Sequence, residues 1–313
     1  MRLAALAGGV GAAKLLGGLN RVSDPANLTI IGNTGDDDVF HGLHVSPDLD
    51  IVTYTLAGIV DGAAGWGIAS DTTHALDQMR RLGVDGWFTL KDRDLGTHLA
   101  RTTWLAEGLA LSEVTDRIRR ALGVAACILP MSDSPVRTKF LTVGTAGAEV
   151  LDFQDYFVRR QCSDQVAEVR FEGAASALPA PGVMQALAEA DRIVVCPSNP
   201  VISIGPILAV PGIREALRAR RADVVAISPI VGGAALKGPA AELLPVVGTD
   251  PSASGVAHLY RDFCGTFVLD NRDLPEAARV QALGMSVLVE DIVMESEAHS
   301  MRLAGAVLKA ILA

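Results

Sequence analysis

The strongest constraint on the fold is a recurring pattern in which a short apolar run ends in a small polar loop and a helical segment follows. The runs are Leu3–Ala7, Leu28–Ile31, Ile193–Cys196 and Val224–Ile227. Short runs that are apolar throughout are typical of parallel strands buried on both faces. Their alternation with helices predicts an α/β fold with a Rossmann-like, doubly wound and mainly parallel sheet.

The chain has 313 residues, 50% of them hydrophobic, and can therefore bury a large core. We expect one α/β domain over residues 1–313. Residues 71–123 are predicted to be mainly helical, with Asp71 capping a helix over Thr72–Leu82. From Ala125 onward the chain is rich in strand formers and predicts a short antiparallel excursion. Together these segments predict an inserted helical and β cap at about residues 71–180.

The first apolar run leads into a glycine loop, Gly8-Gly9-Val10-Gly11, and then into a helix that carries Lys14. Unpaired N–H groups at a helix N-terminus attract anions, so these three glycines and Lys14 are candidate phosphate ligands. Lys14 stands where a dinucleotide-binding fingerprint has its third glycine, and the Gly-Lys-Ser/Thr of a Walker A loop is missing. A tight strand-to-helix turn without a ligand is the alternative.

Carboxylates concentrate after the second apolar run, namely Asp36, Asp37, Asp38, Asp48 and Asp50. Ser46-Pro47 predicts an N-cap and a first-turn proline, which opens a helix to about Val60. We predict that this loop holds a divalent metal for phosphoryl transfer, with Asp50 pointing back toward Asp36. Asp38 and Asp48 are expected to face solvent or the helix dipole.

Further polar candidates lie beyond other strands. Ser198, Asn199 and Ser203 follow the third run, and Asn33 ends the second. Because open α/β sheets bind ligands beyond the carboxyl ends of their strands, we expect these four residues to contact a nucleotide. Ordinary strand-to-helix turns are the alternative. The charged run from Lys91 to His98 is either a solvated helix start or a polar cluster near a ligand.

Bulk properties exclude several classes of partner. The net charge of −9 argues against a nucleic-acid or anionic-membrane surface. No uninterrupted apolar run reaches about 18 residues, so no transmembrane helix is predicted. The four cysteines have no zinc-site spacing and indicate free thiols in a reducing cytoplasm.

Seven blocks, in order along nearly the whole chain, resemble the CofD/FbiA family, the 2-phospho-L-lactate or phosphoenolpyruvate transferases that build the deazaflavin coenzyme F-420. The blocks are Gly8-Gly9-Val10-Gly11, Asn33-Thr34-Gly35-Asp36-Asp37, Ser46-Pro47-Asp48-Leu49-Asp50 with Tyr54-Thr55-Leu56, Asp92-Arg93-Asp94 with Thr97-His98, Leu129-Pro130-Met131-Ser132-Asp133, Pro197-Ser198-Asn199-Pro200 and Ser203-Ile204-Gly205-Pro206. YvcK-like nucleotide-sugar-binding regulators resemble only the glycine loop and the acidic turn. A non-catalytic regulator of that kind is the alternative function.

The resemblance implies that a guanosine diphosphate ester donates its phosphorylated three-carbon acid to the ribityl hydroxyl of the deazaflavin Fo, releasing GMP. It implies Mg²⁺ on Asp36 and Asp50, with Asp37 as a further ligand or water-positioning group. Asp92, Arg93 and His98 are expected to bind the acceptor Fo. A homodimer is a family-level expectation. No serine or cysteine has an obvious adjacent base, so we expect direct transfer without a covalent intermediate.

Two positions depart from the family pattern. Lys91 stands where a glycine is expected, and Ser134 where a second aspartate is common. Both lie in regions expected to line substrate pockets, so they bear on donor or acceptor preference. The sequence leaves open whether phospholactate or phosphoenolpyruvate is transferred, and which loop meets guanine or the deazaflavin.

Overall fold

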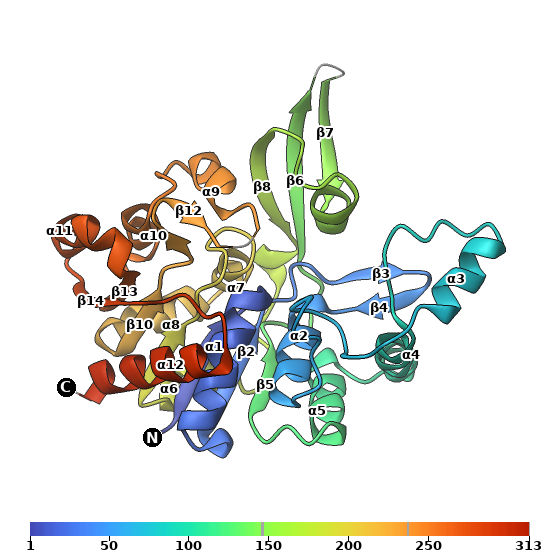
Figure 1. Cartoon of the computed structure of the whole chain (residues 1–313), viewed down its shortest axis with the longest axis horizontal. Helices are drawn as coiled ribbons and strands as arrows, with labels where there is room; N and C mark the ends of the chain where they lie inside the picture. Colours follow the sequence, from blue (N-terminus) through green and yellow to red (C-terminus); the bar gives the residue numbers. More distant parts are fainter. Residues whose placement is uncertain (145–146, 237, 313) are drawn as a thin grey trace.

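The computed structural model describes residues 1–144, 147–236 and 238–312, and its centre is a seven-stranded sheet (Figure 1). The strand order is β14-β13-β10-β9-β1-β2-β5, and every neighbouring pair is parallel. The strands are β1 Leu3–Ala7, β2 Leu28–Gly32, β5 Cys127–Pro130, β9 Arg192–Val195, β10 Val224–Ile227, β13 Thr266–Asp270 and β14 Ser286–Glu290. The predicted doubly wound, parallel α/β sheet is confirmed.

Helices cover both faces of this sheet. Along a strand, successive side chains point to opposite faces, so Leu3, Ala5 and Ala7 of β1 pack in one cluster and Ala4 and Leu6 in another. The first cluster is closed by α1 Gly9–Val22, α2 Pro47–Leu56, α5 Leu111–Ala121 and α12 Glu297–Leu312. The second is closed by α6 Val183–Glu189, α7 Ile204–Ala209, α8 Ile213–Ala219, α10 Ala253–Tyr260 and α11 Ala277–Ala282.

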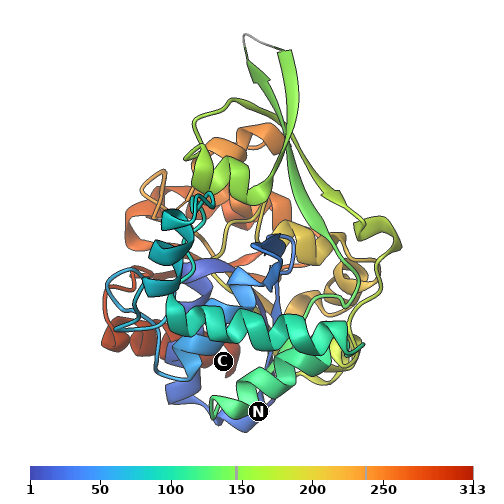
Figure 2. The ribbon, with the colours of Figure 1, turned by 90° about the vertical axis from the view of Figure 1, so that its right-hand side faces the viewer.

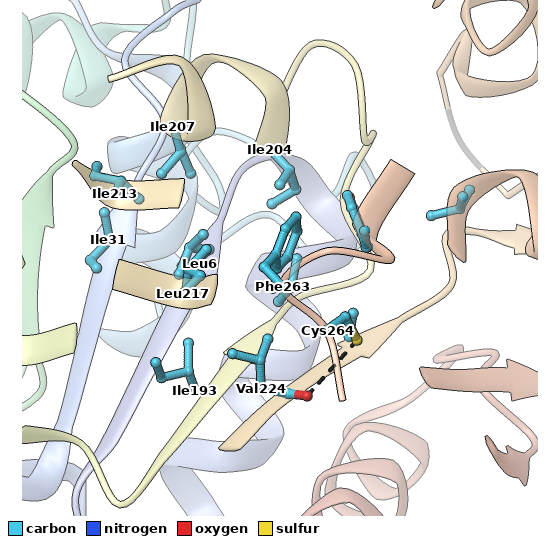
Figure 3. Close-up of a cluster of buried hydrophobic side chains, with 14 of the residues drawn as sticks. Leu6, Ile31, Ile193, Ile204, Ile207, Ile213, Leu217, Val224, Phe263 and Cys264 are labelled. Atoms are coloured by element: carbon cyan, nitrogen blue, oxygen red, sulfur yellow. Dashed lines mark hydrogen bonds between the residues drawn. The ribbon is translucent and has the colours of Figure 1, made fainter. Parts of the chain in front are cut away.

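The second cluster is the larger core, and Figure 3 shows part of it. Ile193 and Leu6 reach up from the sheet toward Ile204 and Leu217 of the covering helices, and all four side chains are fully buried. Burying an aliphatic side chain of this size stabilises the fold by about 1.5–3 kcal/mol. This burial on both faces explains why the strands read as continuous apolar runs.

The strand order reverses direction at β1. From β1 the chain builds outward to β2 and β5 on one side, and to β9, β10, β13 and β14 on the other. Neighbouring loops leave such a switch point in opposite directions, and a crevice opens beyond the carboxyl ends of the two central strands. The glycine loop follows β1 and the Ser198 loop follows β9, so both predicted ligand loops lie at this point.

Two excursions extend from the sheet, as Figures 1 and 2 show. One contains α3 His74–Arg81, α4 Asp92–Ala106 and the hairpin of β3 Asp38–Phe40 and β4 Leu43–Val45. The other is an antiparallel sheet of β6 Arg137–Gly144, β7 Gly147–Asp152 and β8 Val166–Glu172. The antiparallel excursion is as predicted. Between the two, β5 returns to the central sheet, within the residues expected to form the cap.

Local differences from the predicted elements have physical causes. The helix α2 ends at Leu56 rather than near Val60, since Gly58 adopts a left-handed conformation with φ of 71° and its N–H bonds to Thr55. A short helix α9, Ala240–Leu243, and the two-residue strands β11 Ile230–Val231 and β12 Ala234–Ala235 complete the α-helices and β-strands of the described residues. None of the helices in the described part of the chain is long and apolar enough to span a bilayer.

Candidate active site

The loops after β1, β2 and β9 meet at the switch point and interlock. The Gly8 N–H donates to the Ser198 hydroxyl at 3.3 Å, which ties the first loop to the third. A Cβ at Gly11 would lie 2.3 Å from the Pro197 carbonyl oxygen, so only glycine permits this approach. A Cβ at Gly8 would lie 2.6 Å from Asp48 and 2.7 Å from Ser203. The glycines are therefore needed for loop packing.

The N-terminus of α1 already has an anionic partner. The Gly9 N–H donates to Asp48 Oδ1 at 2.7 Å, and Asn33 Nδ2 donates to Asp48 Oδ2 at 2.9 Å. Asp48 was expected to face solvent or the dipole of its own helix, but it is buried and faces α1 instead. Lys14 Nζ donates to the Met294 carbonyl at 2.7 Å. The predicted phosphate ligands thus make intramolecular contacts in this structure.

Asn33 organises the acidic turn. Its Nδ2 also donates to the Ile202 carbonyl at 3.3 Å, and its Oδ1 accepts from the Gly35 N–H at 2.8 Å. One fully buried side chain thereby joins the loops after β2 and β9 to the start of α2. Each of its contacts fixes backbone or carboxylate geometry, so Asn33 positions Asp36 and Asp48.

Three buried carboxylates, Asp36, Asp37 and Asp48, gather in this turn. Burial, followed by the charge of Asp48, raises the pKa of Asp36 well above its ordinary value. Burial raises the pKa of Asp37 to about 8 and that of Asp48 to about 6, although hydrogen bonds from Ser46 and Asn33 oppose these shifts. Ionising these carboxylates together is unfavourable unless a cation compensates them.

A pH dependence of stability follows for the protein free of divalent cations. Folded Asp37, with a pKa of about 8 against an ordinary 3.8, holds a proton that the unfolded chain has lost. Its stabilising contribution is full below pH 3.8 and disappears as pH rises through about 8. The melting temperature of wild type should therefore fall by about 2 °C or more between pH 6 and 8 relative to Asp37→Asn. Calorimetric melts in EDTA test this, with exposed Asp77→Asn keeping the wild-type slope; identical slopes in wild type and Asp37→Asn would contradict it.

The cluster also fits a divalent cation. Asp36 Oδ1 and Asp37 Oδ1 are buried and have no hydrogen-bond partner, which leaves two oxygen acceptors available. Within the described ranges, no three His, Cys, Asp or Glu side chains form a complete metal site. Mg²⁺ commonly takes one or two protein carboxylates and completes its shell with waters and substrate phosphates. The donor set is therefore suited to Mg²⁺ bound together with a phosphate substrate.

Asp50 lies on the side of α2 opposite to Asp48, in a buried ion pair. Arg101 donates to it with both terminal nitrogens: Nη1 lies 3.1 Å from Oδ2, and Nη2 contacts Oδ1. Both side chains are buried. A carboxylate has about four lone-pair sites, so Asp50 retains acceptor capacity beyond this pair. Its charge, however, is already compensated by Arg101.

A polar network continues from Arg101 along α4. His98 Nδ1 lies 3.1 Å from Arg101 Nη1 and must accept, because arginine only donates. The ring proton is therefore on Nε2, which lies 3.3 Å from Asp94 Oδ1. Tyr54 Oη donates to the same Asp94 oxygen at 2.7 Å. Asp94, His98 and Arg101 follow i, i+4, i+7 spacing on α4, a one-face pattern that could have revealed the network from sequence.

The acceptor candidates separate in the structure. His98 joins the buried network, whereas Asp92 accepts from the N–H groups of His74 at 3.0 Å and Ala75 at 2.9 Å, at the start of α3. Asp71 accepts in turn from the N–H groups of Arg93 at 2.8 Å and Asp94 at 3.1 Å, at the start of α4. The prediction that Asp71 caps its own following helix is wrong: the two aspartates cap each other's helices. This exchange fixes α4, and with it Arg101.

The nucleotide candidates form a compact turn after β9. Asn199 Oδ1 accepts from the N–H groups of Val201 at 2.9 Å and Ile202 at 3.3 Å. Its Nδ2 is buried without a partner, so it is an available donor. Ser203 is buried at the start of α7, beside Gly8. The turn thus presents one unsatisfied donor near the switch point.

Comparison with known proteins decides the family. The family model described as 2-phospho-L-lactate transferase CofD matches residues 3–302. The chain belongs to the CofD family. A phosphoenolpyruvate transferase from Kitasatospora aureofaciens is 43% identical over 94% of this chain and 92% of its own length. A 2-phospho-L-lactate transferase from Methanosarcina mazei is 37% identical over 97% of this chain and 98% of its own.

Among solved structures, a UPF0052 family protein from Bacillus halodurans superposes with a TM-score of 0.66 at 16% identity. The match covers 100% of this chain and 98% of that one, and shows a shared fold. The family predicted from the seven sequence blocks is confirmed.

The two departures of this CofD chain from the expected pattern make local contacts. Lys91 Nζ lies 3.4 Å from Asp61 Oδ2 and 5.5 Å from the centre of the Trp66 ring. The Ser134 N–H donates to the Ser132 hydroxyl at 3.0 Å. Lys91 therefore holds the Trp66 loop to the start of α4, and Ser134 forms part of a turn.

Proposed function

We propose that this CofD protein transfers a phospholactyl or phosphoenolpyruvyl group from a guanosine diphosphate ester to the ribityl hydroxyl of Fo, releasing GMP. The observation that carries the proposal is the buried carboxylate Asp36 with an unpartnered oxygen at the switch point of a CofD fold. Relatives named for each of the two acids match at 43% and 37% identity, so both acids are candidates.

In this proposal Asp36 would hold Mg²⁺, and Asp50 would be the second protein ligand, using lone pairs that Arg101 leaves available. When bound, the ion would neutralise charge on the diphosphate and on the leaving GMP phosphate. Asp48 lies beside Asp36 and competes with Asp50 for the role of second ligand.

Asp37 is suited to accept the proton of the attacking hydroxyl. Its pKa of about 8 is close to neutral pH, where a general base works best, and its Oδ1 has no partner. The ribityl oxygen bonds to the phosphorus that carries the acid, the bond from that phosphorus to the GMP oxygen breaks, and the proton passes to Asp37. Ser46 orients the carboxylate by donating to Oδ2 at 2.7 Å.

The loop after β9 is suited to the nucleotide, because it carries the unsatisfied donor Asn199 Nδ2 and its Ser198 contacts the glycine loop. A phosphate oxygen that binds the Gly9 N–H would replace Asp48 Oδ1 there.

Arg93 and His98 are proposed to act on the acceptor side, His98 through the buried network and Arg93 from the exposed start of α4. All four cysteines are free, which fits the proposed reducing cytoplasm.

Calorimetry separates this function from a nucleotide-sugar-binding regulator. We expect Fo and GDP to bind in the presence of Mg²⁺. UDP-sugars should bind at least ~100-fold more weakly, because a transferase site is specific for Fo and a guanine nucleotide, whereas a regulator has no deazaflavin site. Tight UDP-sugar binding without Fo binding would favour the regulator. A titration with NADPH serves as the control for a nicotinamide-binding Rossmann protein.

A further inference from the structure

Arg137 lies beside the acidic turn, outside the sequence blocks that define the family resemblance. It is the first residue of β6. The next residue, Thr138, donates its N–H to the Gly35 carbonyl at 2.8 Å, directly before Asp36. A Cβ at Gly35 would lie 2.7 Å from Thr138 Oγ1, so the strand and the turn are in close contact. The backbone thus brings Arg137 to the edge of the carboxylate cluster.

Arg137 is half-buried, and among the described residues its charge is not in an ion pair. Its Nη1 donates to the carbonyl of the preceding Val136, at 3.2 Å. Among the residues that the structure describes, no carboxylate lies within 4.0 Å of it. By contrast, Lys139, two residues along the same strand, is paired with Asp152. A partly desolvated arginine without a counter-ion is poised for an anionic ligand.

The charge of Arg137 reaches the cluster from the side of Asp37 and His44. After burial and the Ser46 hydrogen bond, Arg101 and Arg137 are the groups that draw the pKa of Asp37 downward. After burial, the same two arginines lower the pKa of His44. Arg101 is occupied by Asp50, so of these two arginines Arg137 is the one without an ion pair among the described residues.

Two of the anion ligands predicted from the sequence contact other protein groups. Lys14 contacts the Met294 carbonyl, and the Gly9 N–H is bonded to Asp48. A diphosphate carries several negative charges, and it would enter a turn that contains three buried carboxylates. It therefore needs a positive side chain in addition to Mg²⁺.

We infer that Arg137 binds phosphoryl oxygens of the diphosphate substrate opposite the Asp36 carboxylate, an inference that rests on the proposed function. A guanidinium offers two parallel N–H donors that match two phosphate oxygens. Negative charge spreads over the equatorial oxygens of the transferred phosphorus in the transition state, where a fixed arginine stabilises it. No proton or electron passes to Arg137.

The test compares Arg137→Gln with Arg170→Gln. Arg170 lies on the neighbouring strand β8, is exposed and pairs with Glu168, so the control removes the same charge from the same small sheet. Calorimetry with inorganic pyrophosphate in excess Mg²⁺ should show at least ~10-fold weaker binding for Arg137→Gln and unchanged binding for Arg170→Gln. The rate of transfer to Fo should fall ~100-fold or more in Arg137→Gln alone. Arg137→Lys, which keeps the charge but not the two-pronged geometry, should be intermediate.

The outcomes separate this inference from the proposed function. Loss of pyrophosphate binding in Arg137→Gln, with Fo binding and melting temperature unchanged, supports the inference even if wild type makes no Fo product. Product formation by wild type, with Arg137→Gln binding pyrophosphate and turning over like Arg170→Gln, overturns the inference and leaves the function standing. Failure of wild type to bind pyrophosphate or GDP at all also overturns it.

Discussion

Replacing Asp36 by asparagine is expected to lower turnover by at least ~100-fold while the protein remains folded and no less stable. Asparagine keeps the size of the side chain, but it carries no negative charge with which to hold Mg²⁺. Because burial and Asp48 raise the pKa of Asp36 well above its ordinary value, an ionised Asp36 opposes folding at neutral pH. Removing that charge should leave the melting temperature equal or higher.

Steady-state transfer to Fo and a thermal melt measure the two effects together. Asp38→Asn is the matched control, because Asp38 belongs to the same acidic triplet and its Oδ1 only accepts from the adjacent Val39 N–H, at 2.7 Å. Asp50→Asn and Asp48→Asn, assayed at varied Mg²⁺, identify the second metal ligand by the larger shift in Mg²⁺ requirement. Wild-type activity in Asp36→Asn would remove Asp36 from the mechanism.

The second large effect concerns stability. Arg101→Met should destabilise the fold by about 3–5 kcal/mol, because it leaves the buried carboxylate of Asp50 without compensation. Arg101 is among the most deeply buried large side chains, and it also contacts His98 and the His44 carbonyl, at 3.1 and 3.4 Å. Replacing Arg101 should therefore also break the contacts that hold α4 against α2, in addition to leaving a buried charge.

Urea unfolding measures this loss, with Arg93→Met as the control, since Arg93 lies on the exposed side of the same helix. The double variant Asp50→Asn/Arg101→Met should be less destabilised than Arg101→Met alone, because its buried charge has been removed. Equal urea midpoints for Arg101→Met and wild type would show that the pair contributes nothing to stability.

The sequence predicted the parts of this fold that depend on local pattern. Apolar runs and the loops that end them determined the parallel sheet, because a strand buried on both faces must be apolar along its length. The same pattern located the glycine loop, the acidic turn and the Ser198 loop at one edge of the sheet. These predictions needed only the rule that parallel strands share an edge for their carboxyl ends.

The pattern could not predict the orientation of individual side chains. Asp48 and Asp50 are two residues apart in one helical turn, so their side chains leave α2 about 200° apart and meet different partners. The structure directs Asp48 to the Gly9 N–H and Asp50 to Arg101, the latter contributed by a helix about fifty residues later. Likewise, Asp71 and Asp92 look like caps of the helices that follow them. In the folded chain, Asp71 instead accepts from the start of α4 and Asp92 from the start of α3.

The most direct test of the central claim is mass spectrometry of Fo after incubation with the protein, Mg²⁺ and each guanosine diphosphate ester in turn. We expect a new species in which Fo carries phospholactate or phosphoenolpyruvate, formed together with GMP. EDTA, or Asp36→Asn, should abolish both products. Unchanged Fo with every donor, from folded protein that binds Fo and GDP, would contradict a transferase built on this site.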